Sequence, residues 1–118
     1  MLHIFKKRKS NSNPFQNWQI PVETDYRFIN NGDSIQYVNA DQSRVSYFSV
    51  LTITGNSLLP AEAPAKKQPS VARSESGWEF KGVRQGGNEV LVCVFSFINE
   101  SDEDWARALF ANIVYIGK

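Results

Sequence analysis

The chain has 118 residues, of which 42% are hydrophobic and 13% aromatic, and its formal net charge at pH 7 is +1. This length and composition are typical of one globular domain and exclude an intrinsically disordered chain. The 13 basic and 12 acidic residues nearly cancel, which argues against general binding to nucleic acid because no strong positive field results.

Residues 1–17 are polar and basic and are broken by Pro14, which predicts a flexible basic N-terminal arm ahead of a single α+β domain over 18–118. A basic run in this arm leaves open a weak attachment to acidic lipid or phosphate, although ordinary solvated termini show the same pattern. The run consists of Lys6, Lys7, Arg8 and Lys9.

Three features predict a cytoplasmic protein without a transmembrane segment. The basic run follows the short apolar start, and no apolar stretch of about 7 to 15 residues comes after it, so the order of a secretory signal is reversed. No segment reaches the roughly 18 to 20 apolar residues of a membrane-spanning helix. The single cysteine, Cys93, rules out an intramolecular disulfide and a metal site built from several cysteines.

The first predicted strands lie between residues 18 and 38. Apolar and polar residues alternate over 18–22, which predicts a short half-buried strand that Pro21 confines to a sheet edge. Asn31 and Gly32 separate two strand-like segments and are typical of a type I′ turn, so we expect a β-hairpin here.

Two longer segments predict the middle of the sheet. Apolar residues stand at both odd and even positions over 44–54 and again over 90–98, so both faces of each strand are apolar. A predicted turn at 39–43 precedes the first of these segments. Such strands are typically covered on both faces. In the first segment the predicted faces are Val45, Tyr47, Leu51 and Ile53 on one side and Phe48 and Val50 on the other. In the second, Cys93 is expected to be an inert core thiol.

The segment 55–76 contains three prolines and no clear period, and it is interpreted as a long loop. Loops longer than about 12 to 15 residues are uncommon in compact domains and tend to be functional or disordered. Trp78 and Phe80 then alternate with charged residues in a strand, and the glycine-rich segment 85–88 predicts a hairpin turn into 90–98.

The C-terminal part predicts a helix followed by a strand. Ser101 and Asp104 resemble a capping box, so the helix is expected to begin near residue 102, with Trp105 and Leu109 on an apolar stripe. Residues 114–116 return as a closing strand. The predicted fold class is therefore α+β: an antiparallel sheet of about five to six strands with a C-terminal helix packed on it, followed by a final short strand.

No pattern predicts catalysis, a metal site or a cofactor. The only histidine, His3, lies in the arm, which removes histidine-dependent triads. The acidic residues 102–104 point about 100° apart on a helix and cannot converge on a cation by themselves. The serines within strands have no base nearby in the sequence, so we expect a protein that is not an enzyme.

The segments TrpGlnIlePro at 18–21 and AspTrpAlaArgAlaLeuPheAlaAsnIle at 104–113, in this order of elements, resemble the Mog1/PsbP-like fold. The resemblance covers roughly residues 18–118. It implies an α/β/α fold that acts mostly by binding rather than by catalysis, and it assigns no functional residue.

The sequence leaves two functional hypotheses open. The first is a non-enzymatic protein-binding module of the bacterial cytoplasm, with an immunity-type inhibitor as one candidate, whose contact surface includes the 55–76 loop. Its expected binding residues are Trp78 with Arg73, Glu75 and Arg84 as a polar rim. The alternative is a small-molecule binder or weak hydrolase with a cleft beside the same loop.

Overall fold

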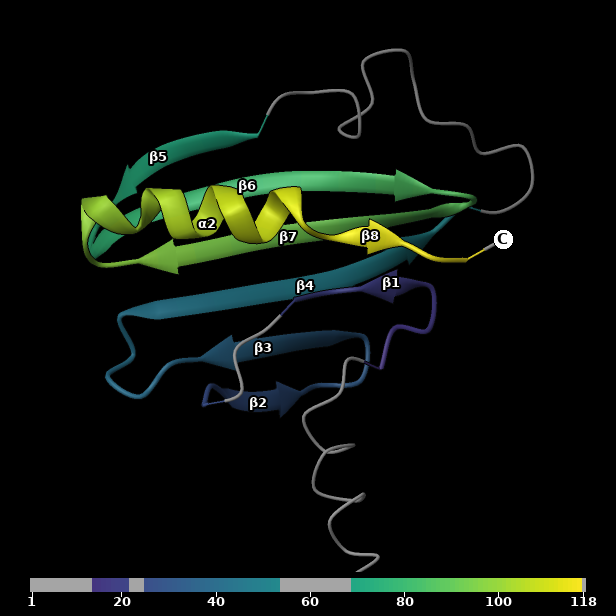
Figure 1. The fold of residues 1–118 in the computed structure, drawn as a ribbon, viewed down its shortest axis with the longest axis horizontal. Coiled ribbons are helices and arrows are strands. Elements are labelled where there is room, and N and C mark those ends of the chain that lie inside the picture. Colours follow the sequence, from purple (N-terminus) through teal and green to yellow (C-terminus); the bar gives the residue numbers. More distant parts are fainter. Residues whose placement is uncertain (1–13, 22–24, 54–68, 118) are drawn as a thin grey trace, which may run out of the picture.

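The computed structural model describes residues 14–21, 25–53 and 69–117, which form two layers (Figure 1). One layer is a six-stranded antiparallel sheet in the order β2-β3-β4-β7-β6-β5. Its strands are β2 (Arg27–Asn30), β3 (Ser34–Val38), β4 (Arg44–Thr52), β5 (Ser70–Ser74), β6 (Gly77–Gly86) and β7 (Glu89–Phe97).

The second layer lies on one face of this sheet. It consists of a 3-10 turn η2 (Glu100–Asp102), the helix α2 (Glu103–Ala111), and a two-stranded sheet that pairs β1 (Trp18–Gln19) with β8 (Val114–Tyr115). The predicted α+β class, with one C-terminal helix on an antiparallel sheet and a final short strand, is confirmed. The last strand pairs with β1 and does not extend the large sheet.

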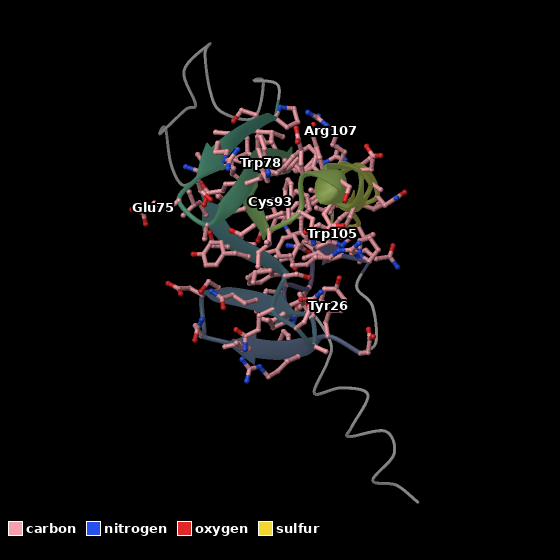
Figure 2. All side chains as sticks on the ribbon, turned by 90° about the vertical axis from the view of Figure 1, so that its left-hand side faces the viewer. Tyr26, Glu75, Trp78, Cys93, Trp105 and Arg107 are labelled. Carbon is pink, nitrogen blue, oxygen red and sulfur yellow. The ribbon has the colours of Figure 1, made fainter. Side chains whose placement is uncertain are left out.

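The core fills the space between the two layers. The register places Phe48, Phe80, Cys93 and Phe95 on the same face of the large sheet, and each is completely buried. Phe80 and Phe95 stack with their ring centroids 5.3 Å apart, and Trp105 of α2 lies 5.9 Å from Phe95. The predicted core position of Cys93 is confirmed (Figure 2).

Two glycines of β6 let the second layer approach the sheet closely. A Cβ atom on Gly82 would lie 2.8 Å from the ring of Phe110 in α2, and one on Gly86 would lie 2.3 Å from the ring of Tyr115 in β8. Both distances are far below an ordinary carbon contact of about 3.5 to 4.0 Å. Glycine at these two positions therefore sets the spacing between the layers.

The ordered chain extends further towards the N-terminus than the sequence suggests. The predicted arm of residues 1–17 is wrong for residues 14–17, because Phe15 packs against the core and the amide of Asn17 donates to Glu89 at 3.3 Å. Residues 1–13, with the basic run 6–9, lie outside the described residues. The strand expected over 18–22 is shorter, and it ends at Gln19.

The hairpin between β2 and β3 is confirmed, but its predicted turn is wrong. Asn30 pairs with Ile35, and the Asn31 N–H donates to Ser34 O, so the two central residues are Gly32 and Asp33. Gly32 has φ of 94° and Asn31 is not in the left-handed region. A glycine with positive φ at the first central position is typical of a type II′ turn.

The predicted loop 55–76 is wrong at its C-terminal end. Residues 70–74 form β5, the edge strand beyond β6. Alternation is weak there because β5 is exposed at almost every position, which removes the sequence signal of a half-buried strand. The rest of the predicted loop, 54–68, lies outside the described residues.

The start of α2 differs in its chemistry from the predicted capping box. The helix begins at Glu103, close to the expected residue, and its N-cap Asp102 makes no side-chain cap hydrogen bond. The Asp102 carboxylate accepts instead from the Arg44 guanidinium at 2.8 Å. This ion pair fixes the start of α2 to the start of β4, which is a tertiary contact that no local pattern encodes.

Candidate functional site

The second face of the large sheet is open. Its two central strands were predicted to be covered on both sides, but no element within 14–21, 25–53 and 69–117 packs on this face, and Figure 2 shows α2 on the opposite side. Tyr47, Val92 and Val94 are half-buried here, and Leu51 is 58% exposed. Within the described ranges the predicted cover on this face is not seen, and these apolar side chains are shielded only by their neighbours in the sheet.

Polar residues surround the apolar centre of this open face. The register sets Tyr47 beside Val94 and Val94 beside Lys81, and it sets Val92 beside Val83. Towards the edges the same face carries Ser34, Gln36, Ser70, Ser74, Glu79, Lys81, Gln85 and Ser96. Glu79 and Lys81 pair with each other at 3.5 Å, so the charges on β6 cancel.

One end of the open face is hollowed where two hairpins meet. The hollow has a volume of about 430 Å³ and lies between the β3–β4 turn, the β5–β6 turn and the end of β7. Glu75 and Trp78 line it, together with Glu79 and Ile98. Residues 74–76, the last three of the predicted loop, thus border a cavity, and they do so as the end of a strand and a tight turn.

The structure brings three of the four predicted binding residues together. The Arg73 guanidinium lies 5.2 Å from the Trp78 ring centroid, on the neighbouring strand, and Glu75 stands exposed in the turn between them. Figure 2 shows Glu75 pointing away from the layer that contains α2. Trp78 is only half-exposed because it also packs against the core.

The fourth predicted residue, Arg84, is not part of this group. It is six positions further along β6, where its guanidinium donates to the Phe110 carbonyl at 2.7 Å and lies 4.7 Å from the Phe110 ring centroid. A cation at this carbonyl stabilises the C-terminal end of the helix dipole. Arg84 therefore fastens α2 to the sheet and lies apart from the other three predicted binding residues.

A second cavity, which the sequence did not predict, lies between α2 and the covered face of the sheet. It has a volume of about 290 Å³ and is mostly apolar. Its lining residues are Pro21, Tyr26, Ser46, Trp105, Ala108, Leu109 and Asn112. Figure 2 shows Tyr26 and Trp105 on this side of the sheet. We call this cavity the helix cleft.

The one available sequence signal for the helix cleft was Ser46. Ser46 occupies a core-facing position of β4, on the same face as Phe48. The alternation of side chains along a strand predicts an apolar residue there. It is 1% exposed, and its Oγ has no hydrogen-bond partner among the described residues. The same holds for the hydroxyl of Tyr37, directly opposite on β3, whose pKa is raised to about 12 by burial.

An ion pair borders the helix cleft. The Arg44 guanidinium donates to Asp102 at 2.8 Å and to the Tyr26 hydroxyl at 3.5 Å, and it lies 5.2 Å from the Trp105 ring centroid. These hydrogen bonds, with that to Asp102 the largest cause, raise the pKa of Arg44 above its ordinary value. The positive charge beside the cleft is therefore permanent and already paired.

The described residues offer little reactive chemistry. No group of three or more histidine, cysteine or acidic side chains gathers within these ranges to hold a metal ion. Burial raises the pKa of Cys93 to about 12, which makes this thiol a poor nucleophile. Over the same ranges, no helix has the length and apolar character needed to cross a bilayer.

A comparison with solved structures supports the fold but brings no function. The chain is similar to a protein from Bacteroides thetaiotaomicron VPI-5482 with a crystal structure at 1.50 Å resolution, with a TM-score of 0.63 and 13% identity. The likeness covers 90% of this chain and 47% of that chain, so this chain spans about half the length of the protein it matches. No family model and no curated protein matches it. The Mog1/PsbP-like resemblance stays a prediction.

Proposed function

We propose that the protein is a non-enzymatic binding module that recognises a protein partner through the open face of its sheet. The observation that carries this proposal is the apolar centre of that face, which includes Tyr47, Val92 and Val94, inside a rim of polar side chains. Protein interfaces have this anatomy, with charged residues depleted from the centre and placed at the rim. A contiguous apolar patch on a sheet marks an interaction site more often than an isolated exposed residue does.

The size of the open face fits a protein partner. The six strands contain 42 residues, and at about 3.3 Å along and 4.8 Å across a strand for each residue they give a face of roughly 670 Å². A stable interface typically buries about 800 Å² on each partner. The open face, with the hollow beside Trp78 and Glu75 at one end, therefore approaches the usual size.

The charge on the face narrows the class of partner. Glu79 and Lys81 neutralise each other, the centre carries no charge, and the strands add one further charge to this face, Arg27 at the β2 edge. A nucleic acid requires a basic surface, whereas a folded protein with its own apolar patch of low net charge fits. The proposed setting is the bacterial cytoplasm, and an immunity-type inhibitor is one form that such a module takes.

A pair of valine substitutions tests the open face. Val94→Lys places a charge in its apolar centre, and Val114→Lys, the matched control, places the same charge on an exposed valine of β8 in the other layer. A partner captured from the host lysate by the parent chain should be purified and its Kd measured by calorimetry for all three proteins. We expect at least a tenfold loss of affinity for Val94→Lys and less than a twofold change for Val114→Lys.

The outcomes separate the alternatives. Equal affinity of Val94→Lys and the parent would refute the open face as the binding surface, provided that circular dichroism shows both folded. A homodimer that light scattering detects in the parent and not in Val94→Lys would identify a second copy as the partner. Trp78 stands by register on the covered face and borders the hollow only at the end of the sheet, so Trp78→Ala should cost more than about 1 kcal/mol of binding free energy only if the contact extends around that end.

A further inference from the structure

The helix cleft is a cavity separate from the hollow at the open face, and the function proposed above does not use it. It lies beneath α2, on the side of the sheet opposite the open face. A partner on the open face therefore leaves the cleft accessible. Any role of the cleft is independent of the protein–protein contact proposed above.

The floor of the helix cleft holds an unusual polar group. Ser46 is 1% exposed, and its Oγ finds no partner among the described residues, although almost all buried hydroxyls in folded proteins are hydrogen-bonded. A hydroxyl that is buried without a partner destabilises the fold. Because Ser46 also lines the cleft, a molecule in the cleft is in a position to supply the missing partner.

The walls of the helix cleft select the shape of that molecule. Trp105 and Tyr26 contribute aromatic rings, and Leu109 and Ala108 contribute apolar surface from α2. Aromatic rings favour flat partners, which stack or pack edge to face. A cavity of about 150 Å³ accommodates benzene, so a volume of about 290 Å³ has room for a molecule of about two fused rings.

The charge around the helix cleft selects a neutral ligand. The nearby cation, Arg44, already donates to the Asp102 carboxylate at 2.8 Å and to Tyr26. An anionic ligand would have to compete with that carboxylate, and a cationic ligand would meet the guanidinium. The lining itself contains no ionisable group except the hydroxyl of Tyr26.

We propose that the helix cleft is a binding site for a small, neutral, flat and largely apolar molecule whose single hydroxyl or N–H group hydrogen-bonds with Ser46 Oγ. The aromatic walls bind the ring system, and the buried hydroxyl orients it. Such a site follows the usual design of small-molecule pockets, in which apolar walls provide affinity and a few placed polar groups provide orientation.

The test uses 2-naphthol as the probe and the full chain labelled with ¹⁵N. We expect saturable chemical-shift changes at Trp105, Ala108 and Asn112, with a Kd on the order of 1 mM or lower, as the small size of the probe implies. Ala108→Phe fills the mouth of the cleft and should weaken binding at least tenfold. Ala111→Phe is the matched control, because Ala111 is also exposed on α2 but does not line the cleft, and it should change the Kd less than twofold.

Ser46→Ala separates the hydrogen bond from simple apolar binding. It should weaken the binding of 2-naphthol about threefold to tenfold, as the loss of one hydrogen bond does. The Kd of naphthalene, which has no polar group, should change less than twofold. The proposal is wrong if 2-naphthol gives no saturable shifts, if the shifts lie outside the cleft, or if Ser46→Ala binds both probes as the parent does. The last result would mean that the hydroxyl makes no hydrogen bond to the bound molecule.

Discussion

Replacing Ser46 with alanine should make the protein without ligand more stable, which is the opposite of what most buried substitutions do. The change removes one oxygen atom from a side chain that is 1% exposed and whose Oγ has no partner among the described residues. No hydrogen bond is lost, and the cost of keeping a hydroxyl from water disappears. That cost is about 1 to 3 kcal/mol for a buried polar group.

The expected gain is smaller than the full cost of burial. Alanine leaves a small additional void beside the helix cleft, which costs a few tenths of a kcal/mol by lost contacts. We therefore expect the free energy of unfolding to rise by about 1 kcal/mol and the melting temperature by about 3 to 5 °C for a domain of this length.

Urea unfolding followed by tryptophan fluorescence measures this difference. Ser49→Ala is the matched control, since Ser49 lies on the same strand, is half-buried and faces the open side of the sheet. It should shift the free energy of unfolding by less than about 0.5 kcal/mol. Destabilisation of 1 kcal/mol or more by Ser46→Ala would show that the hydroxyl already has a partner in the folded protein, and the reasoning on the unsatisfied group would fail.

Three further predictions concern the contacts between the layers. Gly86→Ala should lower the free energy of unfolding by about 2 to 4 kcal/mol, because its Cβ would lie 2.3 Å from the Tyr115 ring; a change below 0.5 kcal/mol in urea unfolding would refute the close approach. Arg84→Met should lower the free energy of unfolding by about 1 to 3 kcal/mol, because it removes the 2.7 Å hydrogen bond to the Phe110 carbonyl. Calorimetry measures this change, and an unchanged melting temperature would contradict the role of Arg84. Burial raises the pKa of Cys93 from 9.0 to about 12, so its contribution to stability is complete below pH 9 and is lost as the pH rises towards 12. The urea midpoint should therefore fall between pH 8 and 11, less so in Cys93→Ala, and an equal fall in both proteins would argue against this cause.

Much of the fold could be predicted because local patterns and tertiary structure agree. The long apolar strands, the glycine-rich turn before β7 and the amphipathic stripe of α2 each carry their own signal. The failures occur where the partner of a segment decides its structure. β5 has almost no alternation because it lies at an exposed edge, where its pairing with β6 and the packing of Val71 against the core support it.

The candidate sites were harder to predict for the same reason. Trp78 and Arg73, which the sequence predicts as parts of one binding surface, are neighbours on paired strands, whereas Arg84 lies apart from them, since nothing local indicates that it contacts the end of α2. The open face was missed because apolar residues on both parities predict two covered faces. Ser46 is one of the strand serines that have no general base nearby in the sequence, and its significance is that it interrupts an apolar face.

The pairing of β1 with β8 determines how the molecule would respond to a pulling force. Trp18 lies opposite Tyr115 and Gln19 opposite Val114, so the chain enters β1 and leaves β8 at the same end of this ribbon. Tension applied through the residues before Trp18 and after Tyr115 would act across the hydrogen bonds and break them one after another, as in opening a zipper. The strands of the large sheet lie between β1 and β8 in the sequence, so this sheet would bear load only after the β1–β8 ribbon had separated. The protein would therefore yield at low force in two steps.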